Sequence, residues 1–106
     1  MNNRFLVEGK PFPYAALYLA EVVKDSMGNE IVVNFTRDGS HRAEIDGEGN
    51  FDFINVPPGR YGLVFDQIST SYLMSWPGKE ESLLVTIEPG TNMDLGTLEY
   101  EAPPTQ

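Results

Sequence analysis

The chain has 106 residues and carries sixteen acidic against seven basic side chains, a formal net charge of −9. This length corresponds to one domain with one core, which excludes a separate catalytic domain beside a binding module. Nucleic-acid binding is not expected, because it needs a basic surface that displaces counterions. The same charge disfavours anionic membrane surfaces. The chain has no cysteine, which excludes disulfides and thiolate metal sites.

No stretch reaches the roughly 18 consecutive apolar residues of a membrane-spanning helix, so membrane insertion is not expected. The first residues are not followed by the apolar core of a signal peptide, because Glu8, Gly9 and Lys10 interrupt it. Two expectations therefore stay open. The native chain is cytoplasmic, or a leader has been removed from it.

Short alternations of apolar and polar residues predict β-strands along most of the chain, and no window shows a helical stripe. In the second strand, Leu17 and Leu19 are expected on one face and Tyr18 on the other. The segment from Gly9 to Pro13 is expected to break any pairing after the first strand, because proline cannot donate to a ladder. The predicted strands cover residues 4–8, 14–23, 30–36, 41–46, 51–53, 61–65, 83–88 and 93–100.

Glycine-rich segments predict the turns between these strands. Residues 25–29 and 46–50 each combine Gly with Asn, which tolerate positive φ, and Asp38-Gly39 is a hairpin signal. The least regular stretch is 66–82, with a possible short strand at 72–76. Residues 101–106 are predicted to form a flexible tail.

The segment from Val56 to Gly59 predicts a rigid corner between two strands. Its two prolines fix φ, and Gly59 is expected to take a left-handed step. Tyr61 then returns to the core with a hydroxyl that needs one partner. Seven or eight short strands with turns at this spacing predict one all-β domain over residues 1–100, an antiparallel β-sandwich.

Three segments together resemble a known family. In residues 11–19, prolines precede an Ala-x-Leu-x-Leu run. Residues 46–63 contain an acidic Gly turn, a Phe-x-Phe strand and a Val-Pro-Pro-Gly-x-Tyr-x-Leu corner. Residues 85–98 form the third segment. This pattern is similar to the carboxypeptidase regulatory-like domain, a transthyretin-like (prealbumin-like) sandwich. The resemblance implies a Greek-key fold and a non-catalytic accessory module of secreted or cell-envelope proteins. An extracellular or cell-envelope location is therefore expected, with the cytoplasm as the alternative.

Histidine chemistry is sparse. His41 is the sole histidine, and with no cysteine it cannot complete a zinc centre. Neighbours along a strand point to opposite sides, so Ser40 cannot face His41 in a catalytic triad. The hydroxyisourate hydrolases and intradiol dioxygenases of the wider fold need several histidines. We therefore expect no enzyme activity and no cofactor.

Two side-chain groups have both a binding and a structural interpretation. Asp46, Glu48 and Asn50 alternate as calcium ligands do, but the twelfth loop position is Pro57 where an EF-hand has glutamate. A hairpin turn is the favoured interpretation. An internal isopeptide bond is not expected either, because the lysines fall in turns or at strand ends, namely Lys10, Lys24 and Lys79.

Tyr72, Met74 and Trp76 lie together in the irregular stretch. Exposed loop aromatics stack on sugars or anchor a protein partner, whereas the structural interpretation is that they close the end of the sandwich. The sequence therefore predicts an accessory module for protein interaction or spacing. The alternative is a carbohydrate-binding module that uses Tyr72 and Trp76. The chain is expected to be a monomer or a weak edge-strand dimer.

Overall fold

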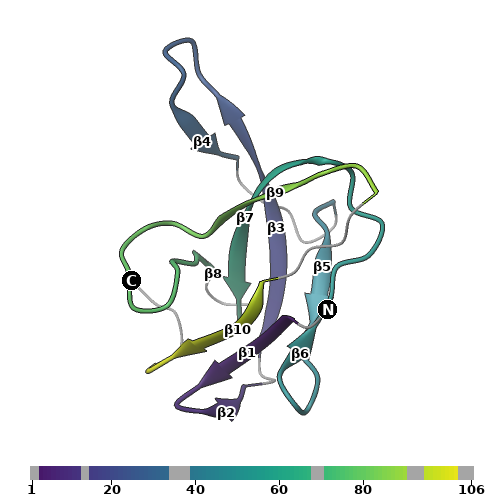
Figure 1. Cartoon of the computed structure of the whole chain (residues 1–106), viewed down its shortest axis with the longest axis vertical. Coiled ribbons are helices and arrows are strands. Elements are labelled where there is room, and N and C mark those ends of the chain that lie inside the picture. Colours follow the sequence, from purple (N-terminus) through teal and green to yellow (C-terminus); the bar gives the residue numbers. More distant parts are fainter. Residues whose placement is uncertain (1–2, 13–14, 34–38, 68–70, 91–94, 103–106) are drawn as a thin grey trace.

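The computed structural model describes residues 3–12, 15–33, 39–67, 71–90 and 95–102 (Figure 1). These residues form strands and no helix, so the all-β prediction is confirmed, and none of them belongs to a helix that could cross a membrane. The strands are β1 (Asn3–Val7), β2 (Lys10–Pro11), β3 (Ala16–Lys24), β4 (Glu30–Val32), β5 (Arg42–Glu44), β6 (Asn50–Phe51), β7 (Gly59–Asp66), β8 (Ser71–Leu73), β9 (Leu84–Ile87) and β10 (Gly96–Tyr100).

The larger sheet is built on the antiparallel pair of β3 and β7. On the free edge of β3, β4 pairs with residues 22–24 and β5 with residues 16–18. On the free edge of β7, β9 pairs with residues 59–62 and β8 with residues 64–66. Each edge is therefore one row of two strands in succession.

The smaller sheet is built on β1, which pairs with β10 on one edge and with β2 and β6 on the other. Where two short strands follow one another along the same edge, they occupy one strand position. The larger sheet then has four strand positions, and the smaller sheet has three. The β1–β10 pair is parallel, from Asn3↔Gly96 to Val7↔Tyr100, which corrects the expectation of a purely antiparallel fold. No hairpin joins these two strands, and only a hairpin would dictate an antiparallel pair.

The expectation that the segment from Gly9 to Pro13 breaks pairing is wrong for Lys10 and Pro11. Leu6 pairs with Pro11 and Val7 with Lys10, across a turn formed by Glu8 and Gly9. Both turn residues have positive φ, at 55° and 76°, as a two-residue type I′ hairpin requires. β2 is an edge strand, the position in a sheet where proline is tolerated.

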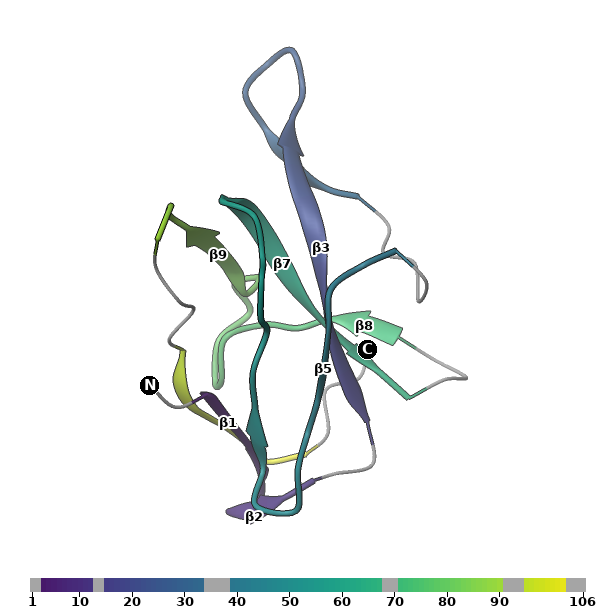
Figure 2. The same ribbon diagram turned by 90° about the vertical axis from the view of Figure 1, so that its right-hand side faces the viewer.

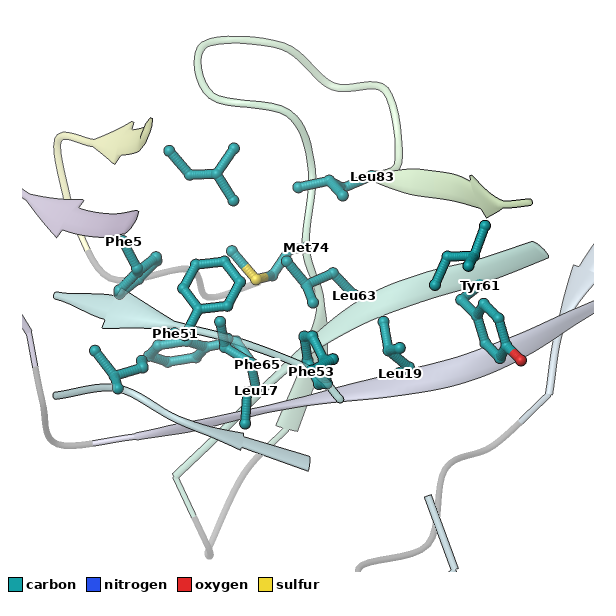
Figure 3. Packing of buried hydrophobic residues seen from close by; sticks show 14 residues of the cluster. Phe5, Leu17, Leu19, Phe51, Phe53, Tyr61, Leu63, Phe65, Met74 and Leu83 are labelled. Carbon is teal, nitrogen blue, oxygen red and sulfur yellow. The ribbon is translucent and has the colours of Figure 1, made fainter. Parts of the chain in front are cut away.

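One core lies between the two sheets, and Figure 3 shows side chains of both meeting in it. Leu17 and Leu19 point into this core, as their alternation predicts. Tyr18 lies on the opposite face, also as predicted, but it is 0% exposed there, beside Ala20 and Val64. The core residues are Phe5, Leu17, Leu19, Ala43, Ile45, Phe51, Phe53, Tyr61, Leu63, Phe65, Met74, Leu83, Ile87 and Leu98.

The corner before β7 is held by Tyr61, whose hydroxyl donates to the carbonyl of Pro57 at 2.8 Å. This is the partner that the sequence demanded, and the geometry resembles the tyrosine corner of other β-sandwiches. The left-handed step is not at Gly59, whose φ of 159° is close to extended. Asn55 takes that step, with φ of 57°, because an Asn side chain tolerates this conformation better than most.

Candidate interaction surfaces

The feature that stands out from the body is a two-stranded ribbon, residues 22–33, here called the arm. β3 pairs with β7 only as far as Glu21↔Tyr61, and beyond that point it pairs only with β4. The amide of Val33 donates to the carbonyl of Glu21 at 2.8 Å, which marks the base of the ribbon. Figures 1 and 2 show the arm projecting past both sheets.

The predicted turn at residues 25–29 closes the arm. One carboxylate oxygen of Asp25 accepts the amides of Met27 and Asn29, each at 2.9 Å. These donors hold the pKa of the Asp25 carboxyl below its ordinary value, the Asn29 amide most strongly. Gly28 supplies the positive φ, at 85°. The arm therefore ends in a defined turn with an ionised carboxylate at its tip.

One face of the arm is apolar and exposed. Val23 pairs directly with Ile31, and Val33 lies two residues further along, so the three side chains share a face. They are 42–46% exposed, and Met27 at the tip is 84% exposed. These four are most of the six large apolar side chains that are exposed among the described residues. The face continues the core side of β3, beyond the part that the second sheet covers.

The two faces of the arm carry different charges. Glu21 lies two positions before Val23 on β3, on the apolar face, and Asp25 lies just after the end of β3, in the turn at the tip. Lys24 and Glu30 are paired on the opposite face. There Arg60 donates to the carboxylate of Glu30, which keeps the pKa of Glu30 below its ordinary value. The apolar face of the arm is thus bordered by negative charge, and Lys24 lies on the opposite face.

The predicted turn at residues 46–50 is built like the one in the arm. One carboxylate oxygen of Asp46 accepts the amides of Glu48 and Asn50, each at 2.8 Å, and these bonds hold the Asp46 pKa below its ordinary value. A calcium ion would have to compete with them for this oxygen. The geometry therefore favours the hairpin interpretation. In the part of the chain that the structure describes, no three His, Cys, Asp or Glu side chains are grouped to hold a metal ion.

A shallow polar hollow of about 480 Å³ lies beside this turn on the smaller sheet. In its floor Arg4 lies directly across from Thr97 on one side and Asn50 on the other. The Nε atom of Arg4 donates to the backbone carbonyl of Glu48 at 2.9 Å. The hollow offers a guanidinium to an anion, but the lining also includes Glu48, in a chain of strongly negative net charge.

The predicted binding group of the irregular stretch belongs largely to the core. Met74 is 1% exposed, and its amide donates to the carbonyl of Leu63 at 2.8 Å; Figure 3 shows its side chain in the same cluster as Leu63 and Leu83. Tyr72 pairs with Phe65. Tyr72 and Trp76 are half-buried and pack against the core. Each side chain is therefore only partly exposed to a ligand.

The remaining candidates have ordinary positions. His41 is half-buried, and its carbonyl accepts the amide of Leu19 at 3.0 Å, so it extends the edge next to β5. Lys10, Lys24 and Lys79 are all exposed, whereas an internal isopeptide bond needs a buried lysine. Of the Asp38-Gly39 hairpin signal, Asp38 lies outside the described residues, as do Pro103 and Pro104 of the predicted tail.

No family model, no curated protein and no solved structure matches this chain. The apolar face of the arm is the feature that sequence reasoning missed. No local pattern signals it, because β3 and β7 have nine and eight residues and the arm arises from the register in which they pair.

Proposed function

We propose that this chain is a non-catalytic accessory β-sandwich module that mediates protein interaction or spacing. We further propose that it is a transthyretin-like Greek-key domain of the carboxypeptidase regulatory-like type, in a cell-envelope or secreted protein. The observation that carries the interaction role is the arm, which places Val23, Ile31, Val33 and Met27 in solvent. The two-sheet architecture and the Tyr61 corner support the fold assignment.

Exposed apolar side chains are common when they are scattered, but a contiguous group that projects from the body indicates a contact surface. Within a strand ribbon such side chains also raise the risk of aggregation. A partner that covers them would remove that cost. We propose that the chain is itself a monomer or a weak edge-strand dimer, because its charge of −9 opposes self-association.

The experiment is a quantitative affinity capture, in which three baits bind proteins from an extract of the organism that makes this protein. The baits are the unchanged chain, Ile31→Lys on the arm, and Ile54→Lys as a matched control. Ile54 is 73% exposed and lies outside the arm residues 22–33. We expect partners that the unchanged chain and Ile54→Lys retain and Ile31→Lys loses. Identical captures from the two variants, both folded by circular dichroism, would remove the arm as the basis of the function.

A further inference from the structure

We propose that the apolar face of the arm binds an extended protein segment in which one apolar side chain is flanked, at alternate positions, by lysine or arginine. This inference rests on the proposed interaction role and specifies the chemistry of the partner. It follows from the order of groups along the arm, from Glu21 at its base, through the exposed face of Val23, Ile31 and Val33, to the carboxylate of Asp25 at its tip.

The spacing of the arm face matches a strand. Alternate residues of a strand share a face at intervals of about 6.6–6.8 Å. Glu21 lies one such interval from Val23 on β3, and the carboxylate of Asp25 lies at the tip beyond Val23, on the amides of Met27 and Asn29. One negative group therefore stands before the apolar side chains of the face, and another stands beyond them. An extended segment that lies along the face meets them with the complementary order, a cation, an apolar side chain and a second cation. Its apolar side chain then covers Val23 and Ile31.

Two acidic side chains of the arm lie on either side of Val23 in the sequence. Asp25 is held ionised by backbone amides, and Glu21 is exposed. The nearest cation on β3, Lys24, faces the other way with Glu30, and Arg60 is joined to Glu30 on that same face. The apolar face therefore presents negative potential without a local counterion among the described side chains of the arm.

A second copy of the chain is the poorer occupant. Packing two arm faces against each other brings Glu21 and Asp25 of one copy against the same residues of the other, and like charges across an interface are costly. Two chains of −9 also repel each other over a Debye length of about 8 Å at physiological salt. A basic segment is instead attracted both by the acidic side chains of the arm and by the net negative charge of the chain.

The test uses two short synthetic peptides. One places a valine between two lysines, with threonines at the intervening positions, and the other has glutamate in place of each lysine. Threonine favours the extended conformation. Each peptide is titrated into the labelled full chain while the backbone amide NMR spectrum is recorded. We expect the lysine peptide to shift the amides of residues 21–33 and the glutamate peptide to leave them unchanged.

Two variants separate local from general electrostatics. Glu21→Lys and Glu80→Lys both replace an exposed acid with a base, so each changes the net charge from −9 to −7. Glu80 lies in the loop after Trp76, outside the arm residues 22–33. We expect Glu21→Lys to weaken binding of the lysine peptide by about tenfold and to admit the glutamate peptide, since it turns one surface attraction into a repulsion. Glu80→Lys should change the affinity by less than about twofold.

Equal weakening by both variants, or shifts spread over the whole chain, would overturn the proposal, because binding would then be unspecific charge attraction. Absence of any shift at residues 21–33 would also overturn it. If the arm-dependent captures of the preceding experiment persist in that case, the interaction role stands and only the basic character of the partner fails. If Ile31→Lys also captures the same proteins as the unchanged chain, both the interaction role and the basic character of the partner fail.

Discussion

Two turns of the same design make a matched stability experiment. Residues 25–29 and 46–50 both run Asp-x-x-Gly-Asn, and in both a carboxylate caps two amides. Their glycines have nearly the same φ, 85° at Gly28 and 89° at Gly49. A β-carbon at Gly28 meets nothing within 4 Å, whereas one at Gly49 would lie 2.6 Å from the carbonyl oxygen of Phe5.

Gly28→Ala therefore bears only the left-handed backbone cost, about 1 kcal/mol. Gly49→Ala bears the same cost and must also push its turn away from β1. The move strains the bond from the Phe5 amide to the Gly49 carbonyl, now 2.7 Å, and a lost backbone hydrogen bond costs about 1 kcal/mol. With looser packing against Leu6, 3.3 Å from that β-carbon, we expect a total of about 3 kcal/mol. Gly47→Ala should be near neutral, since Gly47 has open space and no positive φ.

The assay is urea unfolding followed by circular dichroism. With a slope of about 1–3 kcal/mol per molar urea, a difference of about 2 kcal/mol between the two alanine variants moves the midpoint by about 1 M. The unchanged chain and Gly47→Ala provide the reference. Equal midpoints for Gly28→Ala and Gly49→Ala would refute the reasoning, because the contact with β1 would then have no energetic weight.

Three further predictions test other parts of the molecule. Tyr61→Phe removes the bond to the Pro57 carbonyl and should lower the unfolding free energy by about 1 kcal/mol, measured by urea unfolding, with Tyr72→Phe expected to be milder. The pKa of Asp46 is lower in the folded state than its ordinary value, so the ionised carboxylate stabilises the fold at a pH above the ordinary pKa. This stabilisation is lost as the pH falls through the lowered pKa. Asp46→Asn keeps a capping oxygen and should flatten this acid dependence, as measured by the free energy of unfolding at a series of pH values. Fluorescence of the single tryptophan, Trp76, should resist acrylamide quenching and ignore added oligosaccharides, and protection by one sugar would support the carbohydrate-binding alternative.

Local sequence patterns predicted the parts of the fold that depend on neighbours in the chain. The alternation around Leu17 and Leu19 located the longest strand and the face on which both leucines lie. The two aromatic side chains of the Phe-x-Phe segment, Phe51 and Phe53, both lie in the core. The turns at 25–29 and 46–50 were recognised because glycine at positive φ leaves a clear signal. Tyr61 was expected to need a hydroxyl partner, and it has one.

The features that were missed depend on contacts between distant residues or on an unusual residue. A turn with Glu8 at positive φ is rare, so the β1–β2 hairpin left no signal. Leu6 and Val7 gave no indication of which strand they would meet. The second buried face of β3, with Tyr18 at its centre, cannot be inferred from alternation, since a strand buried on both faces has no polar side. The projecting arm required knowledge of where β7 ends.

The parallel pairing of β1 with β10 has a consequence for the order in which the chain folds. Its partners run from Asn3↔Gly96 to Val7↔Tyr100, so closing this pair forms a loop that contains all the other strands, and loop-closure entropy rises with length. During synthesis β1 is made before all the other strands of the domain, yet one of its edges stays unpaired until β10 has been made. The smaller sheet is therefore completed last. Until then its central strand offers an open edge to chaperones or to a neighbouring nascent chain.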